Sequence, residues 1–282
     1  MRVMASTIDA VLLIPAFNEQ DSIASTISGA KDFIENILVI DDGSTDETAT
    51  RAREAGAKVV SNQSNLGLAR TIRRGYVEAE QRGYAVIVQT DADGQYPSDH
   101  IPKLIKPILE DKADIVIGNR LGDLRYDMPR VKKFGNHAFS YLLSLICMTR
   151  IYDGQSGFRA MTSEIVRDGL LPSFKFSYTQ EMIIRTVKGG YRLHYVDIPF
   201  FPRDHGESRL FSNPLNFAIR GLSIIGMTTI RCHPLSLLLA PGLFLISVSV
   251  ISLIGEFASG LALFLGLSLS MAGIWLSLGT PR

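Results

Sequence analysis

Short apolar runs alternate with amphipathic segments along the first 200 residues. Ala10–Ile14 and Asn36–Ile40 are apolar runs of strand length. The segment between them, Glu19–Lys31, places Ile23 and Ile27 on one face of a helix. Such alternation is typical of parallel strands whose two faces are both covered by helices. The pattern therefore predicts an α/β domain with a mainly parallel sheet.

The same pattern continues further along the chain and shows no internal repeat or low-complexity linker. We expect Ser44 or Thr45 to cap the helix that follows the second strand. One continuous domain over residues 1–210 is the simplest interpretation. The later strands are predicted at Ala57–Ser61, Tyr84–Gln89, Asp114–Gly118 and Tyr191–Val196, and the later helices at Thr45–Ala55, Leu66–Arg82, Asp99–Glu110, Val131–Thr149 and Thr179–Lys188.

The last fifty residues have a different composition. Pro234–Gly255 and Phe257–Thr280 carry no charged residue, and only Glu256 separates them. A helix of roughly 20 apolar residues crosses the hydrocarbon core of a bilayer, so each run is long enough. Two buried core helices are the alternative, although such helices are usually shorter and keep a polar face. We predict an antiparallel transmembrane hairpin of two helices over residues 233–282.

The charges that flank these runs predict their orientation. Arg231 and His233 precede the first run, and Arg282 follows the second. The positive-inside rule then places both ends in the cytoplasm and Glu256 on the other side. The first ten residues are short and polar and do not form a signal peptide. We therefore expect a multi-pass membrane protein whose N-terminal domain lies on the cytoplasmic side.

Residues 211–232, just before the hairpin, have apolar positions at helical spacing that Arg220 interrupts. An amphipathic helix lying in the membrane interface is one interpretation of this segment. A core helix of the N-terminal domain is the other.

Composition and motif searches exclude several classes of protein. The 29 basic and 28 acidic residues nearly cancel, which argues against binding nucleic acid through bulk charge. Cys147 and Cys232 form neither a disulfide framework nor a zinc-type spacing. The chain lacks Gly-x-Gly-x-x-Gly, a phosphate loop ending in Gly-Lys-Ser/Thr, and the Gly-x-Ser-x-Gly elbow of serine hydrolases.

Polar side chains follow four of the predicted strands. In a parallel sheet such strand ends meet in one crevice, where ligands bind. Each segment has a turn or a helix cap as its alternative role. Their joint placement nevertheless favours a polar site. The four segments are Pro15–Glu19, Asp41–Asp46, Asp91–Gln95 and Gly118–Arg120.

Two carboxylates separated by one residue can hold a divalent cation. Asp91 and Asp93 have this spacing, and Gln95 offers a third oxygen. Hard oxygen ligands suit Mg²⁺ or Mn²⁺, which take their remaining ligands from water and from substrate phosphates. A turn in which these residues serve only the backbone is the alternative.

The order of these motifs resembles family 2 glycosyltransferases of the GT-A fold, over about residues 10–210. Two later segments resemble the branch that makes polyprenyl-phosphate sugars, which includes dolichol-phosphate mannose and dolichol-phosphate glucose synthases. Some members of that branch carry membrane helices after the catalytic domain. The matching segments are Val11–Glu19, Ile40–Asp46, Asn65-x-Gly67, Asp91-Ala92-Asp93, Gln155–Arg159 and Arg203–Arg209.

The resemblance also implies roles for individual residues. Those lining the nucleotide-sugar site are Pro15, Phe17, Glu19, Ile40, Asp42, Asp91, Ala92, Asp93, Arg120, Arg203 and Arg209. The catalytic set is Asp91, Asp93, Arg120 and Arg203, and the metal ligands are Asp91, Asp93 and Gln95. Candidates for the acceptor phosphate are Arg130, Ser156, Arg159 and Glu181.

Two departures from the family pattern concern the ligand contacts. Arg209 stands where the family usually has Lys, which keeps the charge but changes the geometry. Phe134-Gly135-Asn136 replaces the Ser-Arg pattern of many mannose synthases.

The acceptor candidates have alternatives of their own. Arg130 could belong with Lys132 and Lys133 to a solvated cluster that faces lipid headgroups. Arg159 could be a structural ion-pair partner, and Glu181 could lie on an exposed helix surface.

The implied activity is inverting transfer of a hexose from a UDP- or GDP-linked sugar to dolichyl or polyprenyl phosphate, with Mg²⁺ or Mn²⁺. The lipid-linked sugar would serve protein or cell-surface glycosylation. A phosphate monoester, with a second pKa of roughly 6, is already nucleophilic at neutral pH. The main alternative is a membrane-anchored family 2 enzyme with a glycan or diacylglycerol hydroxyl as acceptor. That reaction needs a general base, for which Glu181 is the candidate. The expected partners are thus a nucleotide sugar, a lipid phosphate and membrane lipid, and no nucleic acid.

Overall fold

The structure is a computed structural model that describes residues 9–122, 130–172 and 178–201, with residues 242, 246 and 266–271. Contacts between Cα atoms divide the chain into two units, Met1–Pro214 and Leu215–Arg282. Arg203, Arg209, the predicted interfacial helix and most of the predicted hairpin lie outside the described residues.

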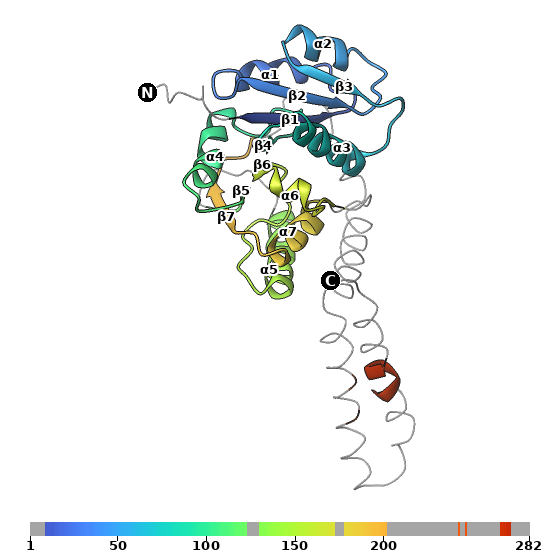
Figure 1. The fold of residues 1–282 in the computed structure, drawn as a ribbon, viewed down its shortest axis with the longest axis vertical. Helices are drawn as coiled ribbons and strands as arrows, with labels where there is room; N and C mark the ends of the chain where they lie inside the picture. Colours follow the sequence, from blue (N-terminus) through green and yellow to red (C-terminus); the bar gives the residue numbers. More distant parts are fainter. Residues whose placement is uncertain are drawn as a thin grey trace. The chain divides into compact units, whose positions relative to one another are not determined.

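The first unit begins with three strands and three helices that alternate as the sequence predicts (Figure 1). Apolar side chains fill the first strand completely, so it is buried on both faces. These elements are β1 (Ala10–Ala16), α1 (Ile23–Ala30), β2 (Asn36–Asp41), α2 (Thr48–Glu54), β3 (Lys58–Ser61) and α3 (Leu68–Gln81).

The second half of this unit is less regular. It contains two short elements, β6 and α6, that the hydrophobic pattern does not predict. Its elements are β4 (Val86–Gln89), the short 3-10 helix η1 (Ser98–His100), α4 (Ile101–Leu109), β5 (Ile115–Asn119), α5 (Arg130–Cys147), β6 (Arg159–Thr162), α6 (Glu164–Arg167), α7 (Tyr178–Lys188) and β7 (Leu193–Asp197).

Seven strands form one mixed sheet in the order β3-β2-β1-β4-β6-β5-β7. All neighbouring strands are parallel except β6, which runs antiparallel to both β4 and β5. The predicted mainly parallel sheet is thus confirmed, but β6 is a strand that the sequence pattern does not predict. Four residues that begin with Arg159 carry no apolar signal of a strand, and only pairing with both neighbours makes them one.

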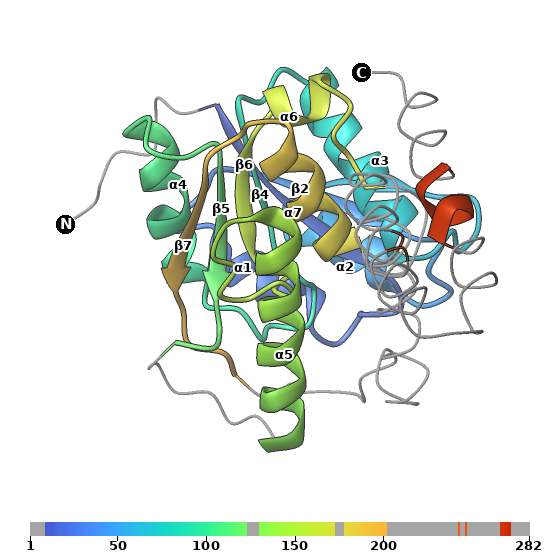
Figure 2. The ribbon, with the colours of Figure 1, turned by 90° about the horizontal axis from the view of Figure 1, so that it is seen from below.

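Helices cover both faces of this sheet (Figures 1 and 2). On one face Leu12 and Ile14 join a buried core with α1, α2 and α4. On the other face α3 packs so closely that a Cβ on Gly75 would lie 2.5 Å from Leu13 Cδ1. Side chains alternate along a strand, so successive residues of β1 supply the two cores in turn.

Helix α2 begins later than the sequence predicts. Its N-cap is Glu47, with no side-chain cap, instead of Ser44 or Thr45. Ser44 Oγ instead accepts a hydrogen bond from Asn18 N, and Asp46 Oδ1 accepts one from Thr48 N. The expected capping groups therefore bind the loop after β1 or close a turn ahead of the helix.

In the second unit, residues 242 and 266 lie against each other. A Cβ on Gly242 would lie 2.9 Å from Gly266 O, and one on Gly266 would lie 3.0 Å from Ile246 Cγ1. Glycines let two helix backbones come this close. None of the helices within the described residues is both long and apolar enough to cross a membrane.

Candidate active site

The predicted site residues lie where β1, β2 and β4 end. β1 lies between β2 and β4, with Ala16 opposite Asp41 and Leu13 opposite Gln89. The strands are parallel, so the segments that follow them leave the same edge of the sheet. The sequence prediction that these segments meet is confirmed for the ends of these three strands.

The loops after β1 and β2 hold each other through side chains. Asn18 has a positive φ of 52° and donates its N–H to Ser44 Oγ at 2.9 Å. Its Oδ1 accepts from Thr45 N at 2.8 Å. Glu19 N donates to Thr48 Oγ1 at 2.8 Å. These hydrogen bonds hold the loop that carries Phe17 and Glu19, both half-buried, beside the end of β2.

Asp42, which follows β2, accepts hydrogen bonds from the loop between β3 and α3. Its Oδ1 accepts from Asn62 Nδ2 at 2.7 Å and from Leu66 N at 2.8 Å. Its Oδ2 accepts from Gly67 N at 2.9 Å, and the carboxylate is buried. Asp42 therefore holds this loop in place, and its predicted contact with the nucleotide stays a prediction.

Pro15 and Ile40 are register partners on β1 and β2, and both are buried. They form the floor beneath the loops at this end of the sheet. Their predicted contribution to nucleotide binding, like that of Phe17 and Glu19, stays a prediction.

Asp91 and Asp93 follow β4 on a tightly held turn. Asp93 is buried, and its Oδ1 accepts from Gln95 N at 3.2 Å. Ala92 O accepts from Thr26 Oγ1 at 3.0 Å, which joins the turn to α1. Asp91 is half-buried against Gly157, where a Cβ would lie 3.0 Å from Asp91 Oδ2. A larger residue at position 157 would crowd this carboxylate.

The donor set at this turn fits a hard divalent cation. Gln95 Nε2 donates to Phe201 O at 3.0 Å, which turns the amide oxygen away from Phe201. Within the described residues no group of three or more His, Cys, Asp or Glu side chains is placed to hold a metal ion. Mg²⁺ commonly binds through one or two carboxylates plus substrate phosphates, so two aspartates with an amide oxygen suffice.

Arg120 follows β5 and forms a buried ion pair with Asp153. Arg120 Nε lies 2.7 Å from Asp153 Oδ2, and Nη2 lies 3.0 Å from Oδ1. Burial alone would raise the pKa of Asp153, but the Arg120 charge and hydrogen bonds outweigh it and lower that pKa. The pair holds Arg120 at the strand end. Its predicted contact with phosphate stays a prediction.

An aromatic cluster joins these parts, and sequence reasoning missed it. Tyr96 OH accepts from Gly157 N at 2.9 Å, and its ring stacks on Phe158 at 5.2 Å. Phe200 meets the Tyr96 ring edge-on at 5.2 Å and lies 5.2 Å from Arg120 Cζ. Burial raises the pKa of Tyr96, which stays a neutral hydroxyl. The sequence does give one signal for this cluster, because Tyr96 directly follows the Asp91–Gln95 segment.

Arg159 begins β6 and is fully buried. Its Nη2 donates to Ser156 O, and its Cζ lies 5.7 Å from the Tyr178 ring centroid. Arg159 Nε and Nη1 and Ser156 Oγ have no hydrogen-bond partner in the part of the chain that the structure describes. No ion pair of Arg159 occurs there either, so the alternative of a structural ion-pair partner is not observed.

The surroundings of Arg159 also include Gln89 and Asp91. Gln89 Nε2 donates to Tyr178 OH at 3.0 Å. Burial raises the pKa of Tyr178, the Asp91 charge raises it further, and the Arg159 charge opposes both. Both charges are therefore close to Tyr178. The predicted acceptor contacts of Ser156 and Arg159 stay predictions, since both side chains are buried.

Glu181 lies on α7 and is buried, so the alternative of an exposed helix surface is wrong. Its Oε1 accepts from Arg185 Nε at 3.0 Å and from Arg185 Nη2 at 2.8 Å. Arg130 begins α5, but its side chain lies outside the described residues, as do Arg203 and Arg209.

Comparison with known proteins gives these features a context. The profile of glycosyl transferase family 2 matches residues 11–170. A dolichyl-phosphate hexose transferase of Haloferax volcanii is 29% identical over 72% of this chain and 86% of that protein. An undecaprenyl-phosphate mannosyltransferase of Micrococcus luteus is 28% identical over 76% of this chain and 93% of that protein.

Comparison with solved structures concerns the fold. Glucosyl-3-phosphoglycerate synthase from Mycobacterium tuberculosis, solved with Mn²⁺, UDP-glucose and phosphoglyceric acid, superposes with a TM-score of 0.61. The match covers 77% of this chain and 79% of that chain at 22% identity. It confirms a GT-A-like α/β fold with a mixed sheet.

Proposed function

The chain belongs to glycosyl transferase family 2, and from that premise we propose that it transfers a hexose from a nucleotide sugar to a polyprenyl phosphate. Two relatives support this acceptor class, since one is named for dolichyl phosphate and the other for undecaprenyl phosphate. The product would be a lipid-linked sugar for protein or cell-surface glycosylation.

The observation that carries the proposal is the turn after β4. It presents Asp91 and Asp93 at the strand end where the β1 and β2 loops also meet. Gly157 leaves space for the Asp91 carboxylate. The ion pair with Asp153 holds the Arg120 guanidinium at the end of β5. This combination of acids and a guanidinium at one sheet edge suits a nucleoside diphosphate.

The chain's own residues position and neutralise the reactants. Asp91, Asp93 and Gln95 would hold Mg²⁺ or Mn²⁺, which supplies a Lewis acid to the leaving diphosphate. Arg120 would add a fixed positive charge, and Arg203 and Arg209 would supply two more. The anomeric configuration would invert, because one displacement joins the acceptor oxygen to the sugar as the diphosphate leaves.

A phosphate acceptor fits the described residues better than a hydroxyl. A hydroxyl acceptor needs a general base, and the candidate for it is Glu181. The Glu181 carboxylate is buried and receives two hydrogen bonds from Arg185. A phosphate monoester is already ionised near neutral pH, with a pKa of roughly 6, and needs no such base.

We also propose that residues 233–282 anchor the enzyme as a transmembrane hairpin, with residues 211–232 in the interface and the catalytic domain in the cytoplasm. Two uncharged runs support it, as does the close approach of Gly242 and Gly266, one from each run. Helices in membranes commonly meet at such small residues.

The test is a transfer assay with the purified full-length protein. A labelled nucleotide sugar and a polyprenyl phosphate should give a sugar lipid that organic solvent extracts, only with Mg²⁺ or Mn²⁺ present. Asp93→Asn should lower that transfer by about 10³-fold, because removing electrostatic stabilisation of a leaving group costs that order. A screen of UDP- and GDP-sugars identifies the donor.

The matched control is Glu110→Gln, at the far end of α4 from the strand ends. It removes one carboxylate as well, and its transfer rate should equal that of the wild type. Substantial transfer by folded Asp93→Asn would refute the metal assignment. Transfer to a sugar hydroxyl but not to polyprenyl phosphate would refute the acceptor.

A further inference from the structure

One surface of the catalytic domain exposes large apolar side chains. Tyr141, Leu145 and Met148 are 68%, 58% and 84% exposed. Their spacing of four and three residues places them on one side of α5 and its end. Tyr152 lies in the loop after α5 and is also exposed. We call these four residues the α5 patch.

Met148 is held in an unusual conformation. Its φ is 49°, in the left-handed region, directly after α5 ends at Cys147. Glycine or asparagine usually occupies this position after a helix, because a side chain there costs about 1–2 kcal/mol. A strained and exposed methionine does not help the domain to fold, which points to a function.

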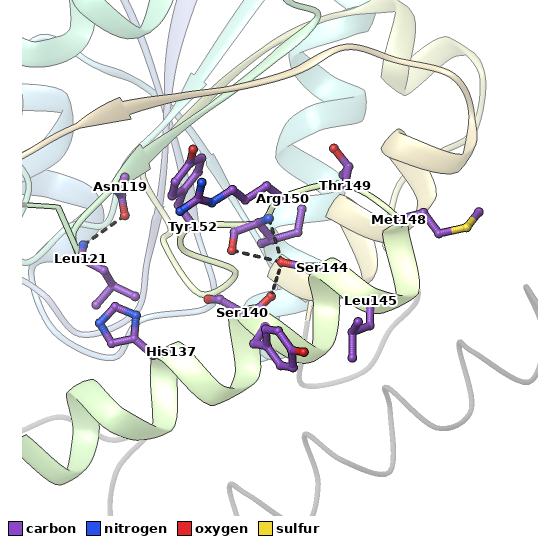
Figure 3. Close-up of a pocket in the computed structure, with 12 residues that line it drawn as sticks. Asn119, Leu121, His137, Ser140, Ser144, Leu145, Met148, Thr149, Arg150 and Tyr152 are labelled. Atoms are coloured by element: carbon purple, nitrogen blue, oxygen red, sulfur yellow. Dashed lines mark hydrogen bonds between the residues drawn. The ribbon is translucent and has the colours of Figure 1, made fainter.

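The four residues of the α5 patch help to line a pocket of about 610 Å³ (Figure 3). His137, Ser140 and Ser144 from α5 form one wall, and Thr149 and Arg150 form another. The Arg150 guanidinium stacks on Tyr152, with Cζ 4.8 Å from the ring centroid. The pocket thus combines an apolar rim with a cationic side.

The segment that carries the patch has basic residues only, and the flanking Asp153 is buried and paired with Arg120. Residues 128–152 contain Arg130, Lys132, Lys133 and Arg150, and no Asp or Glu. An exposed apolar cluster among basic residues is the combination that binds an anionic lipid surface. Tyrosine suits the boundary between headgroups and acyl chains, because its ring is apolar and its hydroxyl polar.

We propose that the α5 patch rests on the membrane surface, with its apolar side chains at the level of the headgroups and the exposed Lys133 and Arg150 of the same segment against anionic lipids. A protein partner would require acidic groups to meet these cations, and the same segment of a second copy offers none, because residues 128–152 contain no Asp or Glu. Anionic lipid supplies both the negative charge and the apolar phase.

The place of the patch relates it to the candidate active site. Asn119, which ends β5 and precedes Arg120, lines the pocket. Tyr152 precedes Asp153, the partner of Arg120. A membrane in contact with the patch would therefore lie close to the strand ends. The benefit to catalysis rests on the proposed function, whereas the docking itself does not.

The experiment measures lipid contact at Met148 in the full-length protein. Met148→Cys in a Cys232→Ser background is labelled with an environment-sensitive fluorophore; Cys147 is buried. The protein is reconstituted in nanodiscs of phosphatidylcholine with phosphatidylglycerol, and a fraction of the lipids carries a shallow quenching group. We expect strong quenching of the label, and loss of that quenching in Tyr141→Glu/Arg150→Glu or without phosphatidylglycerol.

The matched control is Leu109→Cys, because Leu109 is also an exposed large apolar residue but lies at the end of α4. Its label should show no quenching. No quenching at position 148, or equal quenching at both positions, would overturn the proposal. Energy transfer between labelled copies in place of lipid quenching would assign the patch to a protein interface and overturn it too. The readout needs no turnover, so failure of the proposed activity leaves it interpretable.

Discussion

Arg120 and Asp153 show how one ion pair can serve both stability and the site. The Asp153 carboxylate is buried and receives two bonds from the Arg120 side chain and one from its backbone N–H. A paired buried charge adds little net stability compared with an apolar pair, but loss of one partner strands the other. The same pair fixes the guanidinium at the end of β5.

We predict that Asp153→Asn destabilises the protein by about 3–5 kcal/mol at neutral pH, since Arg120 keeps its charge without a counterion. Urea unfolding of the two proteins checks this value. The pKa of Asp153 is lowered in the folded state, so its contribution is present above the ordinary Asp pKa and lost as pH falls through the folded value. The difference between the two proteins should therefore shrink below a pH of about 4.

Asp111→Asn is the matched control for that variant. Asp111 also pairs with an arginine, Arg192, but on the surface. Solvent screens that pair, so the variant should unfold almost as the wild type does. An equal loss of unfolding free energy in both variants would show that the burial of Asp153 has no special effect.

Arg159 illustrates a residue whose environment no local pattern could reveal. Its position in Gln155–Arg159 marked it as a phosphate contact or an ion-pair partner. The fold buries it at the start of β6, over Tyr178, and its phosphate contact stays a prediction. The neighbouring strands β4 and β5 and Tyr178 of α7 create that burial.

The loops that follow β2 and β3 act as one element of the site. Gly43 has a φ of 71°, and a Cβ there would lie 2.7 Å from Ser64 C. Asp42 holds the same loop through Leu66 and Gly67. The glycine thus serves both the left-handed turn and the close approach of two backbones.

We predict that Gly43→Ala costs about 1–3 kcal/mol more than the left-handed conformation alone explains, because backbone atoms must move aside. It should also raise the KM for the nucleotide sugar, since the displaced loop belongs to the crevice. Thermal unfolding and donor titration measure the two effects.

Gly169→Ala isolates the conformational part of that cost. Gly169 has the same φ of 71° but no atom within 4 Å of a Cβ. We expect this variant to lose only about 1–2 kcal/mol and to keep its donor KM. Equal losses for both glycines would contradict the role of the Ser64 contact.

At the scale of the whole molecule, the chain combines a domain of ordinary composition with an uncharged C-terminal segment. The proposed hairpin places the two flanks of that segment on one side of the membrane. Glu256, at its turn, then lies on the other side, because the cost of burying a charge drives it to water.

We predict opposite accessibility of positions 256 and 109 in intact spheroplasts. In a Cys232→Ser background, an impermeant thiol reagent should label Glu256→Cys at once, but Leu109→Cys only after lysis. Labelling of both positions before lysis, or of position 256 only after it, would contradict the orientation. Cys147 is buried and should not react in either state.

Much of the molecule followed from the sequence by itself. Periodicity placed the first five strands and the helices between them within a few residues, because strands buried on both faces are continuously apolar. The order of motifs identified the family, and the Asp91-x-Asp93 spacing marked the turn for which we propose metal binding. Charge distribution separated the C-terminal segment from the rest. These are local properties, and local sequence encodes them.

Only the tertiary structure decided the remainder. β6 became a strand through pairing with β4 and β5, Asp153 met Arg120 across 33 positions of chain, and tertiary packing buried Glu181 on α7. The α5 patch likewise gathers residues whose exposure no hydrophobic pattern distinguishes from burial. In each case the energy comes from partners distant in sequence or from the packing around them, so no window along the chain contains it.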